Sequence, residues 1–151
     1  MELSVFDEVA EYIRALLPND LGDARIRSHR RGVKIWFGPA KPTREHYEAQ
    51  LLARRHVDGK SGMAVEIGFH SEHPKREQNE EVVGALEDAE VKWRKQLGDT
   101  AEAGLFFGSD NWTRLSEAWI EPDADDPDFA FEVASRMVDY ISAIEPLRDS
   151  S

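Results

Sequence analysis

Residues 46–72 read HYEAQLLARRHVDGKSGMAVEIGFHSE, and apolar and polar side chains alternate along both halves of this stretch. One set of alternating positions is apolar: Tyr47, Ala49, Leu51, Ala53 and Val57, then Met63, Val65, Ile67 and Phe69. The other set is polar: His46, Glu48, Gln50 and Arg54, then Glu66, His70 and Glu72. Because the side chains of a strand point alternately to its two faces, this period predicts two half-buried strands, with residues 58–62 as a hairpin connection. One face then belongs to a hydrophobic core, and the other gathers carboxylates, an amide, an imidazole and a guanidinium.

The segments before this stretch predict one helix and further strands. Apolar residues recur at helical spacing over residues 3–17, beginning with Leu3, and Ser4 is a suitable N-terminal cap. Residues 33–37 alternate strongly and predict a strand, whereas residues 24–28 alternate only weakly. The sequence leaves open whether residues 24–28 form a separate strand.

The segments after it predict a long helix, a second hairpin and a final helix. Apolar residues form one helical stripe over residues 82–97, and residues 103–108 and 113–120 alternate as a hairpin. An Asp-Pro pair at 126–127 favours the start of the last helix, which we expect to end at Pro146. No short helix joins two strands, so we predict a single α+β domain over residues 1–151. Its sheet should be mostly antiparallel with five to six strands, and a long central helix and the terminal helices should pack on one face.

The net charge is −11, but the charge is unevenly distributed along the chain. Ten of the 19 basic residues, and only four of the 30 acidic ones, lie between residues 23 and 60. The overall acidity disfavours nucleic-acid binding, because an acidic protein repels the phosphate backbone. A local exception is the basic group Arg25, Arg27, Arg30, Arg31 and Lys34. We interpret this group as a charged strand pair neutralised by acidic helices, in preference to a phosphate-binding strip.

The composition also limits the cellular setting. The chain has no cysteine, which excludes disulfides and thiolate metal ligands. No apolar run approaches the roughly 18 residues that a membrane-spanning helix needs, and the first residues lack the pattern of a signal peptide. We therefore predict a cytoplasmic protein that does not associate with a membrane.

The element order, the acidic balance and the length resemble the small bacterial domains with the type III secretion chaperone fold. In that group a helix, three strands, a helix, two strands and a final helix make a curved sheet with helices packed against it. The resemblance covers nearly the whole chain and implies a protein that binds other proteins rather than a catalyst. The additional strand at residues 24–28 departs from this order, and no functional residue is carried over.

The polar face of the predicted hairpin is the candidate site. Pairing across a five-residue turn places Gln50 near His70, and it also places Glu48 near Glu72. Glu48, His70 and Glu72 would then offer two carboxylates and one imidazole, a set that suits zinc, iron or manganese. A hydrated sheet face is the preferred alternative, so we predict no bound metal ion and no cofactor. In either case, carboxylates around a metal-free His70 should raise the pKa of its imidazole.

Trp36 is the aromatic residue expected on this face. It alternates with Val33, Ile35 and Phe37, so its indole should lie on the polar side of the sheet as a platform for a ligand or for an apolar side chain of a partner. A terminal helix folded over the indole is the alternative.

We predict from these features a non-enzymatic binding module that accepts a protein partner or a small ligand, and we expect a homodimer. The residues of the predicted binding face are Trp36, Glu48, Gln50, Glu66, His70 and Glu72. The alternative function is a metal-dependent or carboxylate-based hydrolase that uses Glu48, His70 and Glu72.

Overall fold

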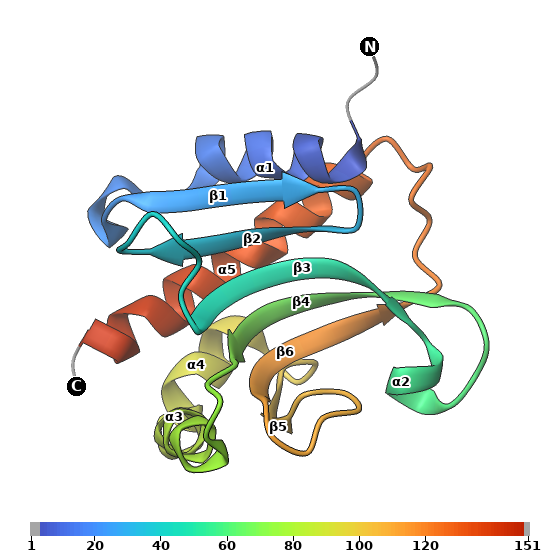
Figure 1. The fold of residues 1–151 in the computed structure, drawn as a ribbon. Helices are drawn as coiled ribbons and strands as arrows, with labels where there is room; N and C mark the ends of the chain where they lie inside the picture. The colour runs from blue at the N-terminus through green and yellow to red at the C-terminus, as the bar shows by residue number, and fades with distance from the viewer. Residues whose placement is uncertain (1–3, 150–151) are drawn as a thin grey trace.

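The computed structural model describes residues 4–149 of the chain. The helices are α1 (Val5–Leu16), the short 3-10 helix η1 (Asn19–Leu21), α2 (Arg55–Asp58), α3 (Arg76–Asp88), α4 (Glu90–Leu97) and α5 (Phe129–Asp149). The strands are β1 (Ala24–His29), β2 (Gly32–Phe37), β3 (Glu45–Ala53), β4 (Met63–Ser71), β5 (Glu102–Leu105) and β6 (Thr113–Ile120). They form one sheet in the order β1-β2-β3-β4-β6-β5, in which every neighbouring pair is antiparallel (Figure 1). The predicted α+β class and the antiparallel sheet are confirmed, and residues 24–28 belong to a separate edge strand.

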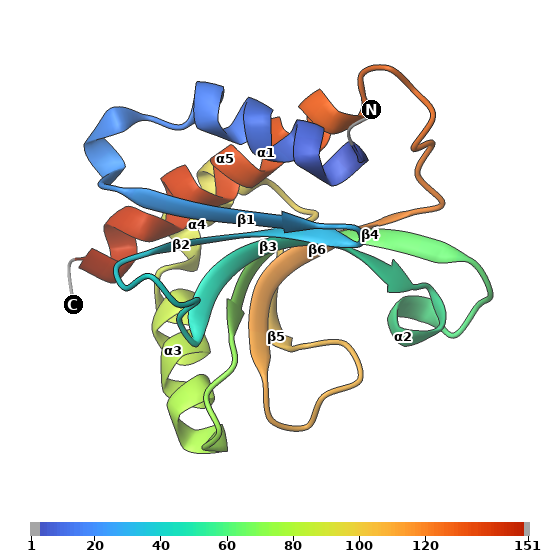
Figure 2. The same ribbon diagram turned by 45° about the horizontal axis from the view of Figure 1, so that its top comes forward.

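The terminal helices α1 and α5 lie together on one face of the sheet, as predicted (Figure 2). Helix α1 packs against β1 and β2, while α5 packs against β3 and β4. Val65, Ile67 and Phe69 of β4 point into this core and are at most 1% exposed. The predicted sidedness of the central strands is therefore confirmed, and their polar side chains face away from α1 and α5.

The connection between β3 and β4 differs from the predicted one, and the difference moves the register. The chain forms the helical turn α2, which the ion pair between Arg54 and Asp58 (2.9 Å) stabilises. The connection is therefore longer than the five residues expected, and Gln50 lies opposite Glu66 rather than His70. The predicted register is wrong by four positions. The two faces are unaffected, because an even shift returns each side chain to the same face.

The predicted long helix is divided in two. Helix α3 ends at Asp88 and α4 begins at Glu90, because the backbone of Ala89 (φ −98°, ψ 14°) departs from helical geometry. At the break, the Leu86 carbonyl oxygen accepts the backbone N–H of Ala89 at 3.0 Å. It also accepts the indole Nε1–H of Trp93 at 2.7 Å. The buried tryptophan therefore stabilises the corner between the two helices.

The terminal helices lie where predicted, but both ends of α5 differ: it begins at Phe129 rather than at the Asp-Pro pair of residues 126–127. Ser4 caps α1, since its hydroxyl accepts a hydrogen bond from the backbone N–H of Asp7 at 3.3 Å. Leu3, expected in the same helix, lies outside the described residues. The prediction that α5 ends at Pro146 is wrong, because the helix continues through it. Proline removes one backbone N–H, and the loss is tolerated here within the last helical turn.

Candidate metal centre

Two imidazoles and two carboxylates meet on the polar face of β3 and β4, at the ends of the strands far from α2. His46 and Glu48 alternate along β3, His70 belongs to β4, and Glu72 follows β4 directly. His46 lies opposite His70 in the antiparallel register. Alternation along the strands then directs all four side chains to one side. Glu48 lies opposite Gly68, so the predicted pairing of Glu48 with Glu72 is wrong, although their side chains still come together.

The four side chains converge on one point. One ligand atom from each of them lies within 4.8 Å of the other three. The Nε2 atom of His46 is 3.2 Å from Glu48 Oε1 and 3.4 Å from Glu72 Oε2. The Nδ1 atom of His70 is 3.3 Å from each of the same two oxygens. Ligands about 2.0–2.1 Å from a tetrahedral zinc ion stand roughly 3.3–3.4 Å apart; the four nitrogen–oxygen separations match this value, and the two remaining separations lie within 4.8 Å.

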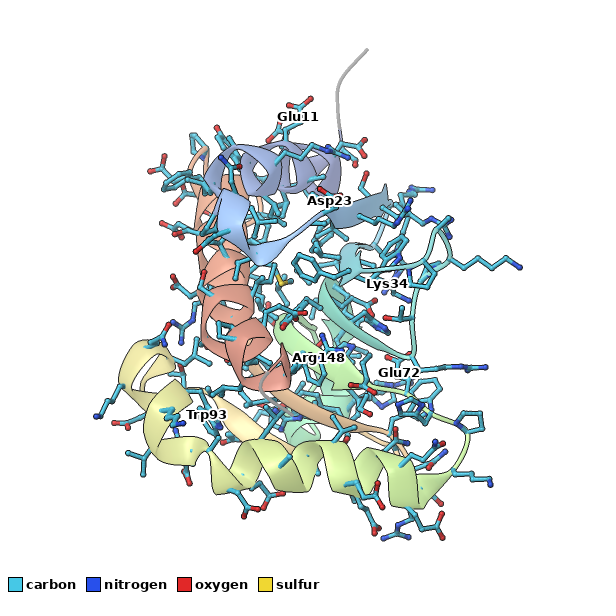
Figure 3. All side chains as sticks on the ribbon, turned by 90° about the vertical axis from the view of Figure 1, so that its left-hand side faces the viewer. Glu11, Asp23, Lys34, Glu72, Trp93 and Arg148 are labelled. Atoms are coloured by element: carbon cyan, nitrogen blue, oxygen red, sulfur yellow. The ribbon has the colours of Figure 1, made fainter. Side chains whose placement is uncertain are left out.

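This part of the polar face is buried. The side chains of Glu66 and His70 have 0% exposure, and Glu72 retains 20%. The ring of Phe106 packs against His70 with its centroid 5.0 Å away. Phe106 lies in the connection between β5 and β6. The prediction of a hydrated sheet face is therefore wrong for the cluster, which solvent reaches at Glu72, on the side of the sheet away from α5 (Figure 3).

Hydrogen bonds on the outer side of each ring fix the direction of its lone pair. The Nδ1 atom of His46 is 2.9 Å from the Thr43 carbonyl oxygen, which can only accept, so Nδ1 carries the proton. The Nε2 atom of His70 is 2.7 Å from Glu66 Oε2, and it donates to this carboxylate. In the neutral form of each ring, the remaining nitrogen therefore presents its lone pair to the centre of the cluster. Metal-binding histidines in proteins almost always have outer hydrogen bonds of this kind.

One nitrogen atom of the cluster lacks a hydrogen-bond partner. Within residues 4–149, His70 Nδ1 is the buried side-chain nitrogen or oxygen atom that forms no hydrogen bond. The nearest carboxylate oxygens, from Glu48 and Glu72, lie 3.3 Å away and form ion pairs with the ring when it is protonated. An unsatisfied buried polar atom costs roughly 1–3 kcal/mol. A metal ion at the centre would use this nitrogen as a ligand and remove the cost.

Without a metal ion, protonated imidazoles and ionised carboxylates stabilise one another in the cluster. Burial disfavours a charged imidazole, but Glu66, Glu48 and Glu72 outweigh this effect and hold the pKa of His70 well above its usual value. Burial would likewise raise the pKa of Glu72, but the attraction of the nearby His46 and His70 imidazoles lowers it to about 2. The pKa of His46 is raised and that of Glu48 is lowered through the same contacts. The direction predicted for His70 is confirmed.

An NMR titration of the metal-free protein should give a midpoint for the His70 ring above roughly 6.5.

A raised pKa adds stability below the unfolded pKa, and this stability is lost as pH rises through the folded pKa. The lowered pKa values of Glu48 and Glu72 add stability above their unfolded pKa, and this is lost as pH falls through the folded pKa. The cluster should thus stabilise the metal-free protein most between about pH 4.5 and 6.5.

The matched variant for this titration is Glu66→Gln, which removes the carboxylate beside His70 Nε2 and keeps its shape. The His70 midpoint should fall in this variant. A midpoint at or below the ordinary histidine value in the unaltered protein would contradict the ion-paired cluster.

The other residues of the predicted binding face have different environments. Gln50 donates to Glu66 Oε1 at 3.1 Å and so supports the carboxylate behind His70. Trp36 is only 3% exposed, and its Nε1 donates to the Pro39 carbonyl oxygen at 2.7 Å. The guanidinium of Arg27 lies 6.0 Å from the indole centroid. The prediction of an exposed indole platform is wrong, because the segment after β2 folds back over Trp36.

His46 is the ligand candidate that sequence reasoning missed. Its position in the alternation assigned it to the polar face, but the predicted register paired His70 with Gln50 instead. A register shifted by four positions brings His46 opposite His70. The alternation of polar and apolar residues was the signal that could have identified His46. The turn is longer than the five residues predicted, so the predicted register did not place His46 beside His70.

Comparisons of the chain with protein-family models, with curated proteins and with solved structures gave no match. The resemblance to the type III secretion chaperone fold therefore stays a prediction. Across residues 4–149, no helix combines the length and the apolar character needed to cross a bilayer.

Proposed function

We propose that this protein is a binding module for a divalent transition metal ion, with zinc as the first candidate, held by His46, Glu48, His70 and Glu72. The observation that carries this proposal is the buried Nδ1 atom of His70, which has no hydrogen-bond partner and points at two carboxylate oxygens 3.3 Å away. Protein interiors rarely leave such an atom unsatisfied, and one recognised explanation for an unsatisfied buried atom is that it is a ligand of a bound ion.

The donor set favours zinc over the hard cations. Two imidazole nitrogens and two carboxylate oxygens suit zinc, iron or manganese, whereas magnesium prefers six oxygen ligands in an octahedron. The cluster of four ligands is also small enough for a tetrahedral ion. Calcium would need more oxygens at longer distances.

A binding role is better supported than hydrolysis. Four protein ligands fill a tetrahedral zinc ion, which is typical of structural sites, while catalytic sites keep one position open. A carboxylate-based hydrolase would use Glu48 and Glu72 as its acid and base. Their oxygens are already 3.2–3.4 Å from the imidazole nitrogens, so they do not form a free catalytic pair. The protein partner and the homodimer expected from the sequence stay predictions.

Calorimetric titration of the metal-free protein with zinc should give one ion per chain and a Kd below about 1 μM, because structural zinc sites contribute roughly 10 kcal/mol or more. Binding should be weaker at pH 6 than at pH 8, since the ion displaces protons from His46 and His70. Magnesium is the control ion and should not bind in the same range. Zinc that binds only at millimolar concentration, or that leaves the NMR signals of both rings unchanged, would overturn the proposal.

A further inference from the structure

A pair of basic side chains lies beside the metal centre on the same face of the sheet. Lys34 of β2 is the direct cross-strand neighbour of Glu48, and Arg27 of β1 is the direct neighbour of Lys34. Direct neighbours have Cβ atoms about 5 Å apart. Arg27, Lys34 and Glu48 therefore form one row across three strands, and this row ends at the metal centre. Figure 3 places Lys34 and Glu72 on the same side of the molecule.

Neither cation of this row forms a close ion pair. Within residues 4–149, neither Arg27 nor Lys34 forms a salt bridge of 4.0 Å or less with a carboxylate. Like charges directly opposite each other in a sheet are destabilising. Arg27 is exposed and Lys34 is half-buried, and Arg27 is held near the Trp36 indole with its guanidinium 6.0 Å from the ring centroid. The row thus keeps two cations together, and the Glu48 carboxylate at its end is the direct cross-strand neighbour that offsets their repulsion.

A metal ion would change the electrostatic balance of this row. In the metal-free protein the Glu48 carboxylate lies directly across the strand pair from Lys34 and attracts it. A divalent cation neutralises the charges of Glu48 and Glu72. Lys34 and Arg27 then lose their compensating negative charge, and the row attracts anions. The rest of the chain is strongly acidic, so this attraction is local.

From this juxtaposition we infer that Arg27 and Lys34 form a subsite for a small oxyanion of the phosphate type, which is occupied when the neighbouring centre holds its metal ion. The inference rests on the proposed function and names the small ligand of the module. The planar guanidinium of Arg27 suits the oxygens of a phosphate group, and the ammonium of Lys34 supplies a point charge. Binding of the anion and of the metal ion is reciprocal, so each raises the affinity for the other by the same factor.

The test measures binding of inorganic phosphate by calorimetry to zinc-loaded protein without excess zinc, and to the metal-free protein. Phosphate should bind the zinc-loaded protein at least about tenfold more tightly. Equal binding to both forms, or no binding to the zinc-loaded form, overturns the inference while leaving the zinc site intact. Failure of zinc itself to bind overturns the proposed function, and with it the metal dependence inferred here. A single-stranded oligonucleotide is the comparison ligand, and binding of the oligonucleotide without binding of free phosphate also overturns the inference.

The variant that isolates the subsite is Lys34→Met, which removes the charge and keeps most of the side chain. Phosphate affinity should fall about tenfold, whereas zinc affinity in phosphate-free buffer should stay equal or rise, because a cation beside Glu48 has been removed. The matched control is Lys41→Met, which makes the same change at an exposed position after β2 and should alter neither affinity. Parallel weakening of zinc and phosphate in Lys34→Met would mean a general structural effect and would contradict the subsite.

Discussion

Replacing Glu72 with Gln should weaken zinc binding by about 10²–10³-fold. Structural zinc sites contribute roughly 10–16 kcal/mol from four ligands, or about 2.5–4 kcal/mol for each. Glu72 is the most exposed of the four ligands, with 20% of its side chain accessible, so the substitution should leave the fold intact. An amide of the same shape has no negative charge, and its oxygen is a much weaker ligand. Competition with a chromophoric zinc chelator measures the affinities.

The matched control for Glu72→Gln is Glu77→Gln. Glu77 lies in the first turn of α3, is exposed and is not part of the cluster, so the change removes one carboxylate charge without removing a ligand. Zinc affinity should change by less than about threefold, because exposed charges are screened. Equal losses in the two variants would show that general electrostatic attraction, and not coordination, accounts for zinc binding.

Replacing Gly68 with Ala should destabilise the protein by about 2–5 kcal/mol. Gly68 lies at the centre of β4 with φ 157°, and a Cβ atom there would be 2.4 Å from the Leu115 carbonyl oxygen and 2.4 Å from Ser116 Cβ. These neighbours belong to β6, which would have to move away from β4. Because Gly68 lies opposite Glu48, the movement would also disturb the metal centre. Denaturant unfolding of the metal-free protein gives the free energy directly.

Gly104→Ala is the control that separates the cost of backbone strain from the cost of steric overlap between a new Cβ atom and a neighbouring strand. Gly104 in β5 has φ 158°, nearly the same backbone conformation, but a Cβ atom there would meet no atom within 4 Å. Its substitution should cost only the strain, about 1–3 kcal/mol. If Gly68→Ala is no more harmful than Gly104→Ala, the close approach of β4 and β6 is not as tight as described.

The sequence is sufficient to predict on which face of the sheet each side chain of the central strands lies. Burial of alternate side chains appears in the sequence as alternating apolar and polar residues. Val65 and Ile67 were assigned to the core and Glu66 and His70 to the polar face, and both assignments are confirmed. The register was not predictable in the same way. It depends on the length of the connection, and Arg54 with its ion pair to Asp58 forms a helical turn that the alternation does not encode.

Burial of the polar face could not be predicted either, because it comes from contacts distant in sequence. The ring over His70 belongs to Phe106, in the connection between β5 and β6. This contact follows no local period. The sequence therefore predicted which side chains share a face, but not that two of them, Glu66 and His70, are removed from water.

The placement of the four ligands at the open ends of β3 and β4 has a consequence for the order in which the protein unfolds. The two strands are already joined by α2 at their other ends, so an ion bound by His46 and Glu72 would close residues 46–72 into a ring. A clip of this kind removes chain entropy from the denatured ensemble. Fraying of the pair from its free ends would become rare, and backbone amides of β3 and β4 would exchange with solvent only through global opening. The edge strands β1 and β5, which lie outside the ring, would then be the first parts of the sheet to separate.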